Sequence, residues 1–96
     1  MTARLLLTSA SVPRLAPHRR LKRDLQRQIW TVQAPERSFM LDDIAHAIVS
    51  RCDGHANVAA IIESLCAAFP DAPRDTVAAD VTHLLQDLAD KGVIAA

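Results

Sequence analysis

In the first half of the chain, apolar and polar residues alternate in short runs that predict β-strands. The expected strands span residues 19–23, 28–32 and 37–41. Trp30 and Val32 share one face of the second strand, and Phe39 and Leu41 share one face of the third. The connections are short, and Pro35 suits the second position of a type I turn. We therefore expect a three-stranded antiparallel meander with its third strand at an edge.

In the second half of the chain, apolar residues recur every three or four positions, which predicts helices. The expected helices span about residues 41–52, 58–69 and 74–91. Gly54 and Gly92 follow the first and third helices, where glycine readily adopts the left-handed conformation, and Asn57 suits the N-cap of the second. The predicted buried faces include Ile44 in the first helix and Phe69 in the second.

Three strands followed by three helices predict a small α+β domain, which we assign to residues 18–96. Residues 1–17 contain two prolines and follow neither repeat, so they are expected to form an N-terminal arm that is flexible or docked on a partner. Leu5, Leu6 and Leu7 are the apolar residues with which the arm could dock on its own chain or on a second copy. We expect a monomer or a weak homodimer.

The composition agrees with one globular domain, since half of the 96 residues are hydrophobic and 23% are charged. Two glycines are too few for a phosphate-binding loop. Cys52 and Cys66 lack the spacing of a zinc site or a disulfide framework, which favours reduced thiols in a cytoplasmic protein. For the same reason no metal is expected. No apolar run approaches the length of a membrane span, so no membrane is expected as a partner.

The charges divide sharply along the chain. Residues 1–30 hold seven basic side chains and one acidic one, whereas residues 31–96 hold four basic and ten acidic. The second and third helices have the outline of a helix-turn-helix, so a small winged-helix nucleic-acid-binding protein is the alternative function. The third helix carries more acidic than basic residues, however, and would repel phosphates. We therefore expect no nucleic acid as partner.

Candidate catalytic groups are sparse. Asp80, His83 and Asp87 share one face of the third helix, but they are expected to be exposed surface charges. His46 and His55 are likewise expected to be solvated. Because no nucleophile motif is present, the sequence predicts neither an enzyme nor a cofactor. A binding module remains, in which an extended peptide pairs with the free edge of the third strand and fits pockets between that strand and the third helix.

One set of residues, in its order and spacing, resembles the PqqD family of pyrroloquinoline quinone (PQQ) biosynthesis. The residues are Arg23-Asp24, Trp30, Ala34-Pro35-Glu36, Leu41-Asp42, Cys52-Asp53-Gly54, Val58, Ile61, Asp80-Val81, Leu84-Leu85, Leu88 and Lys91-Gly92. The resemblance covers about residues 13–95, and its most specific part is Trp-x3-Ala-Pro-Glu followed sixteen residues later by Cys-Asp-Gly. It implies a precursor-peptide recognition element with a fold similar to a winged helix-turn-helix.

The resemblance also implies a function and a site. Family members are peptide chaperones that bind the ribosomal precursor peptide PqqA and present it to the radical S-adenosylmethionine enzyme PqqE. The implied peptide-binding residues are Arg37, Ser38, Phe39, Met40, Leu41, Val77, Asp80, Val81, Leu84 and Leu85. Of these, Phe39, Leu41, Leu84 and Leu85 are also candidates for the core, while Ser38 and Met40 alternate outward.

The basic N-terminal part suggests a further role in partner electrostatics. Arg19, Arg20 and Arg23 are expected to attract an acidic precursor peptide or the enzyme partner.

Overall fold

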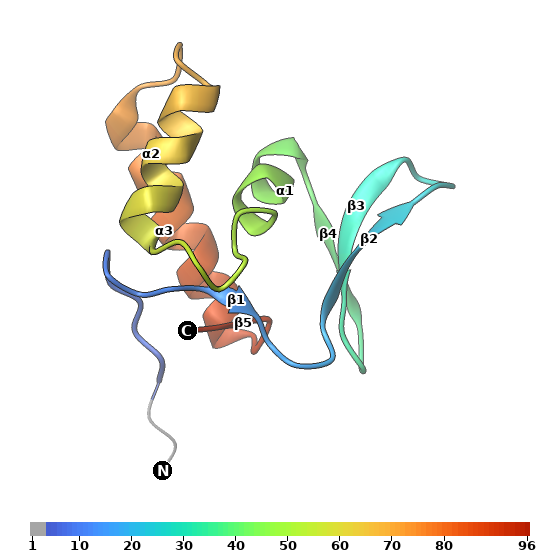
Figure 1. Cartoon of the computed structure of the whole chain (residues 1–96). Helices are drawn as coiled ribbons and strands as arrows, with labels where there is room; N and C mark the ends of the chain where they lie inside the picture. Colours follow the sequence, from blue (N-terminus) through green and yellow to red (C-terminus); the bar gives the residue numbers. More distant parts are fainter. Residues whose placement is uncertain (1–3) are drawn as a thin grey trace.

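The computed structural model describes residues 4–96, which form five strands and three helices in an α+β fold (Figure 1). The elements are β1 (Arg14–Leu15), β2 (Arg20–Asp24), β3 (Ile29–Gln33), β4 (Ser38–Leu41), α1 (Asp43–Val49), α2 (Val58–Ala68), α3 (Arg74–Asp90) and β5 (Ile94–Ala95). Helix α1 lies between the sheet and the paired helices α2 and α3 (Figure 1). The predicted order of three strands and three helices is confirmed.

Strands β2, β3 and β4 form the expected antiparallel meander, with β3 at its centre. Val32 of β3 lies opposite Leu21 on one side and Phe39 on the other, and Trp30 lies opposite Leu41. These side chains belong to the face that packs toward the helices, because residues two apart share a face. Val32 is fully buried at the centre of this inner face.

The sequence did not predict the small sheet in which β1 pairs with β5. Arg14 lies opposite Ala95, and Leu15 lies opposite Ile94. Strands of two residues are too short to show a repeat, and this pair joins opposite ends of the chain.

The segment that was expected to be an arm lies against the domain from residue 4 onward, while residues 1–3 lie outside the described part of the chain. The carbonyls of Ser11 and Ser9 accept hydrogen bonds from the N–H groups of Val58 and Ala59, at 2.9 and 3.0 Å. Leu7 packs against the hydrophobic core. In this structure, residues 4–17 are therefore docked on their own chain.

Caps and left-handed residues set the helix ends, largely as the sequence indicated. Asp42 Oδ1 accepts a hydrogen bond from the Ala45 N–H at 2.7 Å, and Asn57 Oδ1 accepts one from the Ala60 N–H at 2.8 Å. Gly92, after α3, has a φ of 76°, a conformation that favours glycine. These features fix where α1 and α2 begin and where α3 ends.

The core gathers residues from the inner sheet face, the helices and the C-terminal strand. Its buried members are Val32, Leu41, Ile48, Val49, Cys52, Val58, Ile61, Leu65, Val81, Leu85, Leu88, Val93 and Ile94. Two residues placed on buried faces by their spacing are instead exposed: Ile44 by 58% and Phe69 by 48%. Both line a hollow between the helices, so the apolar faces of α1 and α2 extend past the core to the surface.

Two absences hold for the described residues. No helix within residues 4–96 has the length and apolar character to cross a membrane. No group of three or more His, Cys, Asp or Glu side chains in that range is placed to hold a metal ion.

Candidate functional site

The two edges of the meander differ in their ability to accept another strand. Edge strand β2 has the sequence Arg-Leu-Lys-Arg-Asp, and charged side chains oppose pairing with a further strand. Edge strand β4 has the sequence Ser-Phe-Met-Leu and carries no charge. Among the described residues β3 is the only neighbour of β4, so β4 is the edge suited to strand addition.

The backbone of β4 shows which of its groups are free. The Ala34 N–H donates to the Arg37 carbonyl at 2.9 Å, which places a hydrogen-bonded pair at the start of the β3–β4 ladder. In an antiparallel pair, bonded and non-bonded positions alternate, so Phe39 and Leu41 bond to β3. The N–H and C=O groups of Ser38 and Met40 therefore point away from β3 toward the open edge.

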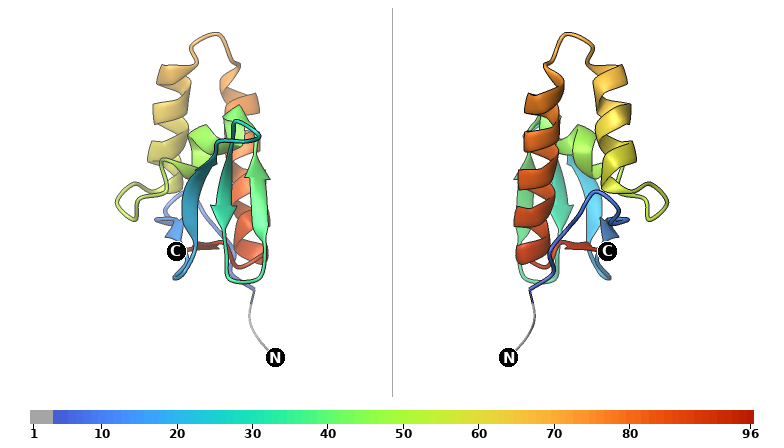
Figure 2. Two further views of the ribbon diagram at one scale, coloured as in Figure 1. Left: turned by 90° about the vertical axis from the view of Figure 1, so that its right-hand side faces the viewer. Right: turned by 90° about the vertical axis from the view of Figure 1, so that its left-hand side faces the viewer.

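Helix α3 lies on the same side of the molecule as β4, as both views of Figure 2 show. Its exposed or half-buried residues Asp80, His83, Leu84 and Asp87 face a hollow of about 480 Å³ that α1 completes with Ile44 and Ala45. We call this hollow the α1–α3 groove. Asp42, which directly follows β4, also lines it.

A smaller apolar hollow continues from the groove between α1, α2 and the first turns of α3. It has a volume of about 210 Å³ and shares Ile44, Ile48 and Asp80 with the groove. Phe69 and Val77 add apolar surface to its lining. A side chain that enters it would meet mainly hydrocarbon.

At the β3–β4 hairpin lies a hollow of different character, about 420 Å³ in volume, which we call the basic pocket. Its lining residues are Arg19, Ala34, Pro35, Glu36, Arg37, Phe39 and Lys91. The guanidinium carbon of Arg37 lies 4.6 Å from the centroid of the Phe39 ring, within the range of a cation–π contact. The inner side of β4 is thus bordered by a mainly basic pocket at one end.

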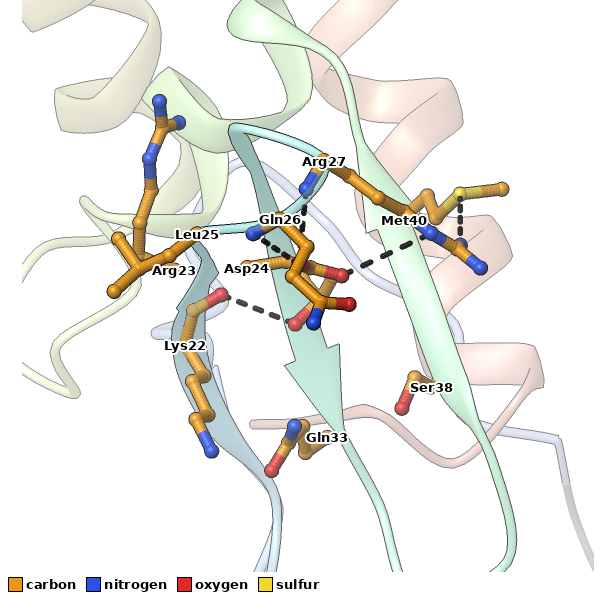
Figure 3. A pocket seen from close by; sticks show the side chains of 10 residues that line it. Lys22, Arg23, Asp24, Leu25, Gln26, Arg27, Gln33, Ser38 and Met40 are labelled. Atoms are coloured by element: carbon orange, nitrogen blue, oxygen red, sulfur yellow. Dashed lines mark hydrogen bonds and ion pairs between the residues drawn. The ribbon is translucent and has the colours of Figure 1, made fainter.

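The outer face of the sheet forms an open, shallow hollow of about 630 Å³ (Figure 3). Lys22, Gln33, Ser38 and Met40 lie on it, and the carboxylate of Asp24 accepts hydrogen bonds from backbone N–H groups of the β2–β3 turn. Met40 is 67% exposed there. This face carries charged and polar side chains together with the exposed apolar residues Leu25 and Met40.

The predicted peptide-binding residues divide into surface and core groups. Ser38 and Met40 are exposed, as their alternation indicated, and Arg37 and Asp80 are exposed as well. Phe39, Val77 and Leu84 are half-buried. Leu41 is buried, and both Val81 and Leu85 have an exposed fraction of zero. Val81 and Leu85 therefore pack in the core and do not line the α1–α3 groove, but Val81 lines the smaller apolar hollow beside Val77 and Asp80.

The three arginines proposed for electrostatic attraction are not gathered in one place. Arg20 and Arg23 are exposed on β2, two strands away from the β4 edge, and Arg23 lies 5.8 Å from the ring centroid of Trp30. Arg19 lies in the basic pocket with Arg37.

Several groove residues were missed by the sequence interpretation. Ile44 and Ala45 were assigned to the core side of their helix, and His83, Asp87 and Lys91 were not assigned to a binding surface. The sequence analysis noted that Asp80, His83 and Asp87 share one face of α3 but interpreted them only as exposed surface charges; Leu84 and, just after the helix, Lys91 continue the same spacing. Asp80, His83, Leu84 and Asp87 line the groove, and Lys91 lines the basic pocket.

Comparison with known sequences gives one consistent result. A family model described as coenzyme PQQ synthesis protein D (PqqD) matches residues 30–94. A PqqA binding protein from Rhodopseudomonas palustris strain TIE-1 is 45% identical over 91 residues, covering 95% of this chain and 88% of that protein. A PqqA binding protein from Gluconobacter oxydans is 37% identical over 89 residues, covering 93% and 92%.

Two solved structures are similar to this chain. The solution NMR structure of the PqqD part of Methylobacterium extorquens PqqCD is 36% identical with a TM-score of 0.79, covering 94% of this chain and 95% of that one. It is described as a functional, stand-alone recognition element for ribosomally synthesized and post-translationally modified peptides. The crystal structure of PqqD from Xanthomonas campestris is 38% identical with a TM-score of 0.54, covering 88% and 93%.

Proposed function

The chain belongs to the PqqD family, and on this premise we propose that it binds the precursor peptide PqqA as an added strand and presents it to the radical S-adenosylmethionine enzyme PqqE. Similar proteins are named PqqA binding proteins. The structural observation that carries the proposal is the uncharged open edge of β4, with the backbone groups of Ser38 and Met40 pointing outward. An extended peptide gains main-chain hydrogen bonds at such an edge.

A strand added to β4 would place its side chains alternately on the two faces of the sheet. One set would continue the inner face beyond Phe39 and enter the α1–α3 groove, where Ile44, Ala45 and Leu84 supply apolar contact. Val77 and Asp80 would meet a side chain that reaches the apolar hollow. Specificity would come from these pockets and affinity largely from the backbone.

The remaining predicted residues contribute to the site in other ways. Val81 and Leu85 hold α3 against the core and so set the width of the groove. The second set of peptide side chains would lie beside Met40 on the outer face, where a third protein could contact them. This arrangement suits presentation of the peptide to an enzyme, and the chain itself acts as a chaperone and not as an enzyme. We place it in the cytoplasm, consistent with its two free cysteines. We expect a monomer or a weak homodimer.

A backbone amide chemical-shift titration of the isotope-labelled protein with PqqA tests the binding mode. We expect shifts at residues 37–41 and along the groove face of α3, with the β2 edge as internal control. Duplex DNA in place of PqqA should leave the spectrum unchanged. Shifts confined to β2, or produced by DNA and not by PqqA, would contradict the proposal.

Presentation to PqqE needs a separate measurement. PqqE should modify PqqA faster when this protein is present, and Met40→Pro, which removes an outward backbone donor, should abolish the gain. An equal rate with and without the protein would leave peptide binding standing and refute presentation.

A further inference from the structure

We infer that the basic pocket binds a carboxylate of the bound peptide and thereby sets the register of the peptide on β4. This inference rests on the proposed function and adds to it a second, electrostatic site. The pocket has Phe39 from the inner face of β4 and Lys91 from the end of α3 in its lining. The β3–β4 hairpin and the C-terminal end of α3 lie at the same end of the molecule (Figure 2).

Arg19 has donors suited to such a ligand. Its Nη1 donates to the Pro17 carbonyl at 2.7 Å. Its Nε is buried and has no hydrogen-bond partner among the described residues, which is uncommon for a buried donor. Nε and Nη2 form the remaining side of the guanidinium fork, whose geometry matches the two oxygens of a carboxylate. Because Nε is buried, a carboxylate would reach this fork only after the Arg19 side chain turns toward the pocket, whereas the exposed Arg37 can contact an anion directly.

The other charged groups determine how strongly the pocket attracts an anion. Arg37 is exposed and lies against the Phe39 ring, and the Lys91 Nζ lies 2.8 Å from the carboxylate of Asp87. Glu36 is the one carboxylate in the lining and opposes binding of an anion. Arg19 and Arg37 therefore supply the uncompensated positive charge, and Lys91, already paired with Asp87, contributes less.

The charges differ between the two hollows beside β4. The α1–α3 groove is lined by Asp42, Asp80 and Asp87, which repel a carboxylate, while the basic pocket at the hairpin has Arg19 and Arg37. A slip of two residues would keep each peptide side chain on its own face but would displace it by about 6.6 Å along β4. Such a slip would remove an acidic residue from the basic pocket, so this pocket discriminates between registers that backbone pairing alone does not distinguish.

Affinity measurements by titration calorimetry with PqqA test the inference. Arg19→Gln and Arg37→Gln should each weaken binding about tenfold, as expected for the loss of a charge-assisted hydrogen bond. Lys22→Gln, which removes the same charge from the outer face, is the matched control and should change affinity less than about twofold. Glu36→Gln should tighten binding. The amide spectrum of each variant reports whether it is folded, and the exposed Arg37 keeps the test valid if Arg19→Gln unfolds.

Modified peptides identify the carboxylate. PqqA with single Glu→Gln or Asp→Asn changes, and PqqA with an amidated C-terminus, separate a side-chain carboxylate from the terminal one. One of these peptide changes should lower the affinity for the wild-type protein about tenfold and leave the affinity for Arg37→Gln almost unchanged. The peptide change and Arg37→Gln would then remove the same interaction. If PqqA binds the wild type but Arg19→Gln and Arg37→Gln behave like Lys22→Gln, the carboxylate site is wrong. If PqqA fails to bind the wild type, the proposed function itself fails.

Discussion

Trp30 and His46 stack face to face, with ring centroids 4.3 Å apart and an angle of 8° between the ring planes. Trp30 belongs to the central strand β3 and lies opposite Leu41 of the edge strand, while His46 belongs to α1. The stack therefore connects the sheet to the helix that borders the groove. His46 was expected to be solvated, and its half-buried place on the Trp30 ring corrects that prediction.

The stack should contribute measurably to stability. His46→Ala should lower the free energy of unfolding by about 1 kcal/mol, the usual worth of an aromatic pair. His55→Ala, a change in an exposed loop, should cost less than about 0.5 kcal/mol. A double-mutant cycle with Trp30→Leu, followed by circular dichroism in urea, isolates the pair. Additive effects of the two changes would show that the rings do not interact.

The docked N-terminal segment should also stabilise the domain. Leu7 packs on the core, and its N–H donates to Gln86 Oε1 at 3.0 Å, whereas Leu6 is 64% exposed. Leu7→Ala should therefore lower the free energy of unfolding by about 1 kcal/mol, and Leu6→Ala by less than about 0.5 kcal/mol. Equal and negligible effects in urea unfolding would indicate that the segment is not docked in solution.

The same segment has an electrostatic link to α3. The Arg4 guanidinium donates two hydrogen bonds of 2.8 Å to Asp90, and with a further bond from Gln86 it holds the pKa of that carboxyl below its ordinary value. The contact is exposed, so we expect it to orient the segment more than to stabilise it.

The buried thiol of Cys52 should make stability depend on pH in the alkaline range. Burial, helped by the Asp53 carboxylate, raises the pKa of the Cys52 thiol from its ordinary 9.0 to about 12. Between these values the folded state retains a proton that the unfolded state loses, so stability falls as pH rises. The stability difference between wild type and Cys52→Ala should shrink by about 1.4 kcal/mol for each pH unit above 9. A difference that is constant from pH 8 to pH 11 in urea unfolding would contradict this.

The sequence predicted the larger elements because their side chains repeat. Alternation at Trp30 and Val32, and the helical spacing up to Leu88, located the meander and the three helices to within a few residues. The β1–β5 pair was missed since two-residue strands have no repeat. Ile44 was placed in the core because a repeat identifies an apolar face but not how much of that face a neighbour covers.

The candidate site was predictable only in part for a related reason. The alternation of Ser38 and Met40 identified the exposed positions of the edge strand, and its lack of charge was visible in the sequence. The basic pocket joins Arg19, Arg37 and Lys91, which are distant in sequence and meet only because the hairpin and the end of α3 converge. No local sequence pattern indicates that residues so distant in the chain lie close together in the fold.

The most direct test of strand addition at β4 compares the affinity of PqqA for Met40→Pro and Met40→Ala. Both variants lose the side chain, but only proline removes the N–H that points to the open edge. Arg23→Pro removes the corresponding outward N–H from β2, and its comparison with Arg23→Ala controls for the effect of proline in an edge strand separately from the Arg23 charge. We predict at least about tenfold weaker binding for Met40→Pro than for both Met40→Ala and Arg23→Pro, since a donor is lost from the added ladder. Equal affinities for Met40→Pro and Met40→Ala, with all variants folded, would contradict the account.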